Sequence, residues 1–233
     1  MDESSREWEA GTRRFVLAHL PGRPARVLEI GCGEGHLTVA MARAGHRVVG
    51  VDPIAPKGGI FRRTTFEAFE DAERFDCVVA SLVLHHIPDL ARALDKSVRM
   101  LRPGGQAIVV EFAWDRIDEA TARWYHEHLP ADDDRRSQAF LAPCCDRWAR
   151  ARLQGASEPF ERYCGEWAQQ EGLHDSATML HELRARYALS SLEWGPYLAS
   201  DLEGVTHADE RARIGRGDVQ ATSFRLVGRP GAG

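Results

Sequence analysis

The chain has 233 residues, a formal net charge of −5, 43% apolar residues and 28% charged residues. This length accommodates one α/β domain with a sizeable core and one elaboration, and the composition excludes an intrinsically disordered chain. The acidic balance argues against a nucleic-acid partner, and no apolar run is long enough to span a membrane. The stretch from Met1 to Arg14 is acidic and polar, unlike a signal peptide, so we expect a cytoplasmic protein.

The cysteines agree with that compartment. The five cysteines are Cys32, Cys77, Cys144, Cys145 and Cys164. Two of them lie in apolar, strand-like runs and two are adjacent, which suits reduced thiols better than a disulfide framework or a metal site.

The first half of the chain alternates helical and strand-like patterns. Apolar residues at helical spacing predict a helix that ends at the break between Pro21 and Pro24. Short apolar runs after it predict strands at residues 26–31, 46–52, 60–66, 75–84 and 106–112, with helices at 37–45 and 90–101 and a turn at 102–105. This alternation is typical of a parallel sheet covered on both faces by helices.

The pattern changes after Phe112. Residues 113–175 are predicted as helical pieces broken at Pro130, Pro143 and Pro159, and they hold four of the six tryptophans. A helix at 176–187 and strands at 189–198 and 220–229 follow, with a short helix at 206–214. We therefore divide the chain into an N-terminal helix or lid (1–24), a core (25–112), a helical insert (113–175) and a C-terminal part that completes the sheet (176–233).

A glycine-rich loop follows the first strand. A dinucleotide loop needs Gly-x-Gly-x-x-Gly, but the sequence Gly31-Cys32-Gly33-Glu34-Gly35-His36 places a histidine at the third glycine. A phosphate loop needs a Lys-Ser or Lys-Thr pair after the glycines, and none follows. The loop therefore indicates a ligand other than a dinucleotide or a nucleoside triphosphate.

Two carboxylates narrow the choice of ligand. Glu29 lies in a strand that should be buried, so it needs a cationic or hydrogen-bonded partner. Asp52 ends the second strand, where it can accept both hydroxyls of a ribose. A ribose, a cationic amino-acid part and no phosphate describe S-adenosylmethionine. The structural alternative is that Glu29 pairs with an arginine of the N-terminal helix and Asp52 caps a turn.

Four segments in order resemble the signature segments of class I S-adenosylmethionine-dependent methyltransferases, in their small-molecule (type 11-like) branch. They are VLEIGCGEG, VVGVDP, FDCVVASLVLHHIPD and LRPGGQAIVVEF, between about Arg26 and Phe112. The resemblance implies a Rossmann-like, doubly wound seven-stranded sheet. Its last strand inserts antiparallel between the fifth and sixth.

The resemblance also implies a set of cofactor contacts. The methionine part would lie against Glu29 and the loop residues Gly31, Cys32, Gly33 and Gly35, with Ser81 and Leu82 beneath it. Asp52 would bind the ribose and Pro53 the adenine face. Phe66 and Glu67 lie where the family reads the adenine edge, but TTFEAF departs from the usual motif, so backbone groups of residues 65–68 are the alternative.

Methyl transfer requires alignment of the acceptor with the methyl carbon and exclusion of water, and a base only if the acceptor atom carries a proton. His85 and His86 follow the fourth strand and are the candidate bases, although in relatives this position mainly shapes the pocket. Glu111 is a further candidate, whereas Asp115 is expected in a solvated loop. His126 and His128 are badly spaced for a metal pair, so we expect no metal site.

The leading hypothesis is therefore an enzyme that methylates a small molecule at oxygen, nitrogen or carbon and releases S-adenosylhomocysteine. The insert either forms a lid over the acceptor or packs as an interface, and the protein is a monomer or a homodimer. The alternative is a regulator that binds the cofactor without transferring the methyl group. A nicotinamide oxidoreductase is disfavoured by His36.

Overall fold

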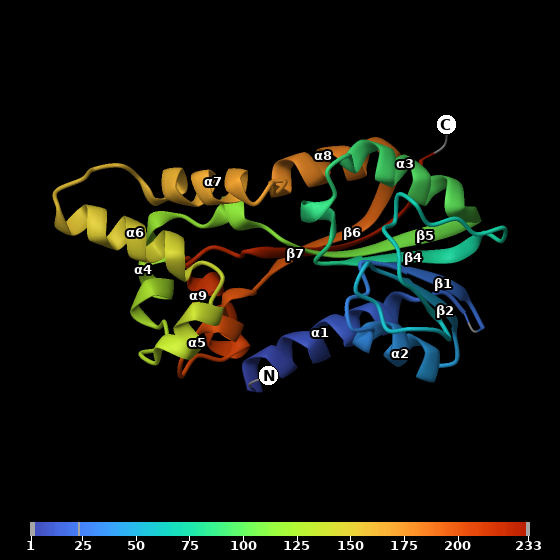
Figure 1. Ribbon diagram of the computed structural model, residues 1–233, viewed down its shortest axis with the longest axis horizontal. Coiled ribbons are helices and arrows are strands. Elements are labelled where there is room, and N and C mark those ends of the chain that lie inside the picture. The colour runs from blue at the N-terminus through green and yellow to red at the C-terminus, as the bar shows by residue number, and fades with distance from the viewer. Residues whose placement is uncertain (1–2, 23, 232–233) are drawn as a thin grey trace. The chain divides into compact units, whose positions relative to one another are not determined.

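The computed structural model describes residues 3–22 and 24–231, with side chains described from Glu7 onward (Figure 1). Residues 1, 2 and 23 of the predicted N-terminal segment, and 232–233 of the C-terminal part, lie outside the described residues. Within the described ranges, no helix has the length and apolar character that crossing a bilayer demands.

A seven-stranded sheet forms the centre of the fold, with the strand order β3-β2-β1-β4-β5-β7-β6. Parallel pairs join β1 to β2 and β4, β2 to β3, and β4 to β5, while β7 runs antiparallel between β5 and β6. This confirms the predicted Rossmann-like α/β sheet and its inserted last strand. The strands are β1 (Arg26–Ile30), β2 (Arg47–Val51), β3 (Phe61–Arg62), β4 (Phe75–Ser81), β5 (Leu101–Phe112), β6 (Tyr187–Gly195) and β7 (Ser223–Pro230).

Helices cover both faces of this sheet, as the alternating pattern predicts. In Figure 1, α3 (Leu90–Met100) and α8 (Ser176–Arg186) lie on one face, and α1 (Glu3–His19) and α2 (His36–Arg43) on the other. The carboxylate of Asp89 accepts the amide of Arg92 at 3.0 Å and caps α3, as expected. A single turn of 3₁₀ helix, η1 (Leu84–His86), follows β4.

The predicted turn at residues 102–105 is part of a strand instead. β5 begins at Leu101, and its register with β4 shifts from Phe75↔Leu101 to Cys77↔Gln106. Residues 102–105 of β5 therefore lie opposite the single residue Asp76 of β4, and they form an irregularity in which Gly104 adopts φ +80°. The glycines bend the strand rather than end it.

The helical insert has no strand between residues 113 and 175. It contains η2 (Trp114–Arg116), α4 (Glu119–Glu127), α5 (Asp133–Gln138), α6 (Ala142–Leu153) and α7 (Phe160–Gln170), and η3 (Leu198–Asp201) and α9 (His207–Arg216) follow β6. The helical pieces are interrupted where predicted: Pro130 lies between α4 and α5, Pro143 lies in the first turn of α6, and Pro159 is the N-cap of α7.

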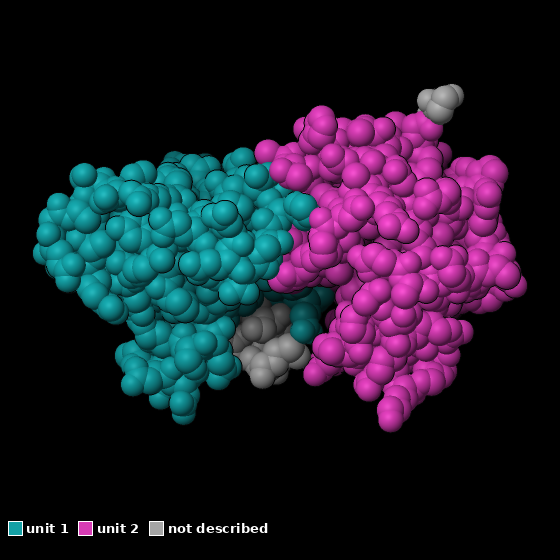
Figure 2. Space-filling model, turned by 45° about the horizontal axis from the view of Figure 1, so that its top comes forward, with its two compact units in different colours: residues 1–10, 112–176, 194–224 teal, residues 11–111, 177–193, 225–233 magenta. Residues whose placement is uncertain are grey.

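The chain divides into two compact units, which Figure 2 colours separately. Unit 1 contains residues 1–10, 112–176 and 194–224, and unit 2 contains residues 11–111, 177–193 and 225–233. Unit 2 holds the glycine-rich loop and most of the sheet. Unit 1 holds the helical insert.

Candidate functional site

The glycine-rich loop connects β1 to α2 at the carboxyl edge of the parallel strands. The amides of Gly31 and Cys32 both donate to the carbonyl of Val51, at 2.9 and 3.2 Å, and so fasten the loop to the end of β2. Ligands of open α/β sheets bind at this edge. The predicted loop residues are thus gathered where a ligand is expected.

The three loop glycines serve different purposes, although all have positive φ (+70°, +51° and +85°). A Cβ at Gly31 would lie 2.3 Å from the side chain of Val83, and one at Gly35 2.3 Å from the ring of Phe61. These two glycines allow close packing. Gly33 has no neighbouring atom within 4 Å of that position, so there is open space beside its α-carbon.

Glu29 is buried beneath this loop, with 2% of its surface exposed. Its Oε2 accepts a hydrogen bond from the hydroxyl of Thr38, on the first turns of α2. No ion pair joins it to an arginine in the described part of the chain, so the structural alternative for this residue is wrong. Burial, together with the carboxylate of Asp52, raises the pKa of Glu29 to about 8 despite the Thr38 hydroxyl.

The thiol of Cys32 faces the same two carboxyl groups. Burial, and then the charges of Glu29 and Asp52, raise the pKa of Cys32 to about 12. The side chain is 7% exposed. It therefore stays protonated near neutral pH and lines the loop as a small apolar group rather than as a nucleophile.

Asp52 follows β2 directly and is half-buried. Its Oδ2 accepts the amide of Gly33 at 3.0 Å, and its Oδ1 accepts the amide of Ile54 at 2.9 Å. The carboxylate thus tethers the glycine-rich loop, and it also caps the turn after β2, as the structural alternative predicts for this residue. Each oxygen has a second lone pair, which leaves acceptor capacity for a hydroxyl pair such as that of a ribose.

Pro53, Ser81 and Leu82 lie at the ends of neighbouring strands. Pro53 is exposed beside Asp52, and Ser81, the last residue of β4, is half-buried. Leu82 is the one non-glycine residue with positive φ (+52°) among the described residues. Backbone strain of this kind is typical of sites where a precise conformation is required.

At the turn where the family reads the adenine edge, the Phe66 side chain is buried and the Glu67 side chain is exposed. The side chain of Phe66 is 5% exposed and packs beneath the ammonium group of Lys96, which lies 5.3 Å from the ring centroid. Glu67 is exposed, and its carbonyl accepts a hydrogen bond from Lys96 at 3.1 Å. A ligand edge at this turn would therefore meet backbone groups or the Glu67 carboxylate, not the Phe66 ring.

The two histidines after β4 differ in their environment. His85 is buried, and its Nδ1 lies 2.6 Å from Oε2 of Glu111, whereas His86 is exposed. The two rings contact each other with centroids 4.1 Å apart. Glu111 is 0% exposed, so its carboxylate does not face solvent.

The remaining candidates make contacts within unit 1. Asp115 is half-buried, and its carboxylate accepts the amide and the hydroxyl of Ser176, each at 2.8 Å, so the expected solvated loop role is wrong. His126 contacts Asp146 at 3.2 Å, and His128 contacts the carbonyl of Trp124 at 2.8 Å. Among the side chains that the structure describes, from Glu7 to Gly231 with position 23 aside, no cluster of histidine, cysteine and acidic residues has the arrangement of a metal site.

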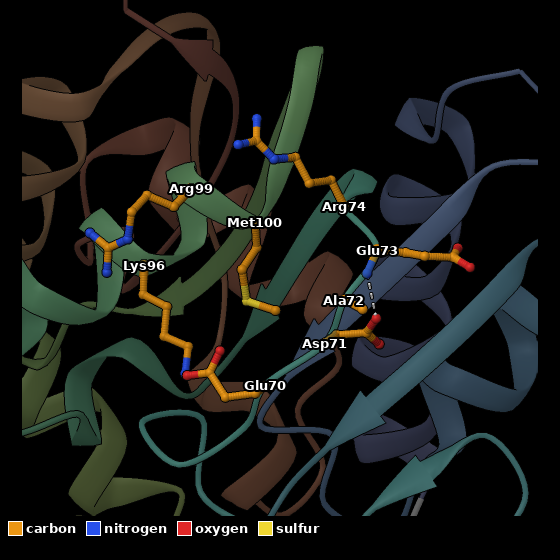
Figure 3. A pocket seen from close by; sticks show the side chains of 8 residues that line it. All are labelled: Glu70, Asp71, Ala72, Glu73, Arg74, Lys96, Arg99 and Met100. Carbon is orange, nitrogen blue, oxygen red and sulfur yellow. Dashed lines mark hydrogen bonds and ion pairs between the residues drawn. The ribbon is translucent and has the colours of Figure 1, made fainter.

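A pocket of about 260 Å³ lies elsewhere in unit 2 (Figure 3). Its walls precede β4 and β5, so it opens at the amino edge of the sheet, opposite the glycine-rich loop. Lys96 points toward Glu70, with their charged atoms 3.2 Å apart. The lining residues are Glu70, Asp71, Ala72, Glu73, Arg74, Lys96, Arg99 and Met100.

Sequence reasoning missed Thr38 and Val83, and it missed how Glu111 acts. Thr38 lies in the first turn of α2. A hydroxyl at the start of the helix that follows a buried acid is a sequence signal for a hydrogen bond to that acid. Glu111 was recognisable as the one acid in the buried run IVVEF. The contact of Val83 with Gly31 had no sequence signal, because it depends on the conformation of the loop after β4.

The groups at this edge fit the cofactor that the sequence suggests. Gly33 offers open backbone, Glu29 is a buried carboxyl group whose hydrogen-bond partner is a neutral hydroxyl, and Asp52 keeps acceptor capacity. A cationic amino-acid group would compensate Glu29, and the hydroxyls of a ribose would suit Asp52. A pyrophosphate would meet two carboxyl groups instead.

Comparison with curated proteins finds relatives named ubiquinone biosynthesis O-methyltransferase. The one from Bradyrhizobium sp. (strain ORS 278) is 39% identical over 97 residues, which cover 36% of this chain and 38% of the relative. The one from Alkalilimnicola ehrlichii is 36% identical over 166 residues, which cover 58% of this chain and 61% of the relative. The matched segments thus span less than two thirds of these relatives.

Solved structures share the fold at low identity. The N-methyltransferase NodS from Bradyrhizobium japonicum WM9, in complex with S-adenosyl-L-homocysteine, has a TM-score of 0.54 at 17% identity and covers 99% of this chain and 89% of its own. The 1,6-didemethyltoxoflavin-N1-methyltransferase from Burkholderia thailandensis has a TM-score of 0.54 at 18% identity and covers 95% of this chain and 77% of its own.

The sequence model of the family described as Methyltransferase domain matches residues 3–140. This match includes β1 to β5, the glycine-rich loop and the two histidines after β4. Because the match covers more than half of the chain, the chain belongs to the methyltransferase domain family.

Proposed function

We propose that this protein transfers a methyl group from S-adenosylmethionine to a small-molecule acceptor at oxygen, nitrogen or carbon. The observation that carries the proposal is the loop between β1 and α2, where Gly33 has open space above a left-handed backbone and two carboxyl groups flank it. Membership of the methyltransferase domain family supports it. When bound, the cofactor supplies a methyl group that its sulfonium charge has already activated.

The methionine part is proposed to bind against Glu29 and the loop. The buried Glu29 carboxyl group attracts the cationic amino-acid end, and the loop backbone from Gly31 through Cys32 and Gly33 to Gly35 forms the floor. Ser81 and Leu82 support the other side of this part, at the end of β4. These groups orient the ligand through charge and backbone contacts.

The nucleoside part is proposed to bind along the ends of β2 and β3. Asp52 accepts the ribose hydroxyls, and Pro53 presents an apolar surface to the adenine face. The turn that contains Phe66 and Glu67 reads the adenine edge through its backbone, since the Phe66 ring is packed in the core.

A base is needed only for an acceptor atom that carries a proton. Of the two histidines predicted as catalytic, we assign that role to His86, because its side chain is exposed while His85 is buried and bonded to Glu111. An imidazole can hold a proton near neutral pH, which suits the deprotonation of a hydroxyl or an ammonium group.

We propose that an aromatic cluster of unit 1 selects the acceptor, with Phe140 and Trp167 from the helical insert and three rings from elsewhere in this unit. Five aromatic rings of unit 1 contact one another at centroid distances of 4.7 to 6.1 Å, and all except Phe112 are half-buried. Such rings are the usual lining of small-molecule sites. They are Trp8, Phe112, Phe140, Trp167 and Tyr197.

Calorimetric titration with S-adenosylhomocysteine and with NAD tests the cofactor, and transfer of labelled methyl groups to a panel of phenols, amines and carbon acids tests the activity. We expect S-adenosylhomocysteine to bind and NAD not to bind. Tight NAD binding without a response to S-adenosylhomocysteine would sink the proposal. Cofactor binding without transfer to any acceptor class would favour the regulatory alternative.

A further inference from the structure

The carboxylate of Glu111, at the end of β5, collects three hydrogen bonds from the loop after β4. The amides of Val83 and Leu84 lie 2.8 and 2.6 Å from Oε1, and Nδ1 of His85 lies 2.6 Å from Oε2. Both oxygens are engaged and the residue is 0% exposed. Glu111 therefore fixes three consecutive residues of this loop.

The loop that Glu111 holds is in direct contact with the glycine-rich loop. The side chain of Val83 fills the space where Gly31 lacks a Cβ, since a Cβ there would lie 2.3 Å from Cγ2 of Val83. A shift of Val83 would change the room available to the Gly31 backbone. The amide that sets the position of Val83 is one of the three bonded to Glu111.

A further hydrogen bond from β5 holds a strained residue of the same loop in place. Leu82 has φ +52°, a conformation that costs a non-glycine residue free energy, and its own amide donates to the carbonyl of Val110 at 2.9 Å. Val110 precedes Glu111 in β5. Two consecutive residues of β5 therefore fix residues 82–85.

His85 links Glu111 to the exposed histidine. Nδ1 of His85 lies 2.6 Å from Oε2 of Glu111, and a hydrogen donated from this nitrogen would complete the set of hydrogen bonds that the carboxylate accepts. The His85 ring contacts the His86 ring at 4.1 Å between centroids. The orientation of His86 thus depends on a ring that Glu111 holds.

We infer that Glu111 is a positioning residue for cofactor binding, which acts through Val83, Leu84 and His85 and touches neither the cofactor nor the acceptor. The inference rests on the proposed function, because it assigns to Glu111 the placement of Leu82 and Gly31 against S-adenosylmethionine. It replaces the general-base role that the position of Glu111 suggests.

Four variants test this assignment. Glu111→Gln keeps one acceptor oxygen for the two amides but turns an NH₂ group toward His85. His85→Asn keeps a donor near the position of Nδ1, and His85→Phe removes it. Glu210→Gln is the matched control, because Glu210 is also fully buried and accepts three amides (Tyr197, Leu198 and Ala199, at 2.8 to 3.1 Å), but in unit 1.

The affinity for S-adenosylhomocysteine is measured by calorimetry and the melting temperature of each variant is recorded beside it. Glu111→Gln and His85→Phe should weaken binding by roughly 10–100-fold, the range for hydrogen bonds to a charged group. His85→Asn should stay within about 3-fold of the wild type, because its amide restores the donor. Glu210→Gln should melt earlier without losing affinity.

The ring-nitrogen signals of His85 in ¹⁵N NMR provide a readout that a merely structural role would not move. The wild type should carry the ring hydrogen on Nδ1, and Glu111→Gln should shift it to Nε2 because the NH₂ group now donates. Equal affinity losses in Glu111→Gln and Glu210→Gln, or an unchanged tautomer, would overturn the inference.

Two further outcomes keep the inference and the proposed function separate. A wild-type protein that binds no S-adenosylhomocysteine contradicts the proposed function, while the tautomer of His85, which needs no ligand, still decides whether Glu111 controls that ring. If Glu111→Gln does not fold, the comparison of His85→Asn with His85→Phe decides, and equal affinities would overturn the inference.

Discussion

Three buried glutamates show how far the environment of a residue decides its role. Glu111 and Glu210 each accept three hydrogen bonds, whereas Glu29 accepts one, from the hydroxyl of Thr38. Burial also raises the pKa of Glu210, although three amides oppose that shift. A buried carboxyl group with one neutral partner is the least compensated of the three, so Glu29 is the one suited to a cationic ligand.

Asp52 provides the first test at this scale. Replacing Asp52 by Ala removes the acceptor of the Gly33 and Ile54 amides, so we expect binding of S-adenosylhomocysteine to weaken by about 1–3 kcal/mol, the cost of stranded hydrogen-bond partners. Asp52→Asn, which keeps one acceptor oxygen, should lose less. An unchanged dissociation constant for Asp52→Ala in calorimetry would contradict the ribose assignment.

At the scale of elements, the glycine-rich loop is held between β2, β3 and the loop after β4. Gly31 and Gly35 are closed in by Val83 and Phe61, while Gly33 faces open space. The three glycines look alike in sequence. Their contacts divide them into two that permit packing and one that leaves room for a ligand.

Alanine at these positions should separate folding from binding. Gly31→Ala should destabilise the protein by about 1–2 kcal/mol for its left-handed backbone and by roughly 1–3 kcal/mol more for the clash with Val83. Gly33→Ala should show the backbone cost alone but lose affinity for S-adenosylhomocysteine. Urea denaturation and calorimetry measure the two effects, and wild-type affinity in Gly33→Ala would contradict the open-backbone interpretation.

The elements themselves were largely predictable, because buried parallel strands are short apolar runs and the helices between them have apolar faces. The strands at Arg26–Ile30, Arg47–Val51 and Phe75–Ser81 all lie within the predicted segments. The turn predicted at residues 102–105 was wrong, because Gly104 and Gly105 can also form an irregular strand edge. Pairing with β4 decides between the two, and a single sequence carries no signal for it.

The site was predictable in its acids and glycines but not in its contacts. Glu29, Asp52 and the loop follow from residue type at strand ends, which parallel strands bring to one edge. The hydrogen bond from Thr38 and the three bonds to Glu111 join residues 9 to 28 positions apart. Such pairs depend on side-chain direction in the folded chain, so spacing alone does not reveal them.

At the scale of the whole molecule, Glu29 links stability to pH. Its pKa of about 8 in the folded protein exceeds the ordinary value of 4.5, so the folded state keeps a proton that the unfolded state releases between these values. Stability through this group is therefore greatest below pH 4.5 and falls as the pH rises, by at most about 1.4 kcal/mol per unit, until about pH 8. Urea denaturation from pH 5 to 8 should show a shallower decline in Glu29→Gln, and identical slopes would contradict the shift.

The affinity for the cofactor should have the opposite pH dependence to the stability of the ligand-free protein. A cationic amino-acid group beside Glu29 favours the ionised carboxylate, so binding should release the proton that the ligand-free protein holds below about pH 8. The affinity for S-adenosylhomocysteine should then rise with pH, by up to about tenfold per unit, and level off near pH 8.

Calorimetry in two buffers of different ionisation enthalpy counts the released protons. Glu29→Gln should release fewer protons, because glutamine has no proton to give up. The other titratable groups that face this position are Asp52 and Cys32, and both remain in the variant. Equal proton release in the variant and the wild type would contradict the release of a proton from Glu29 on binding.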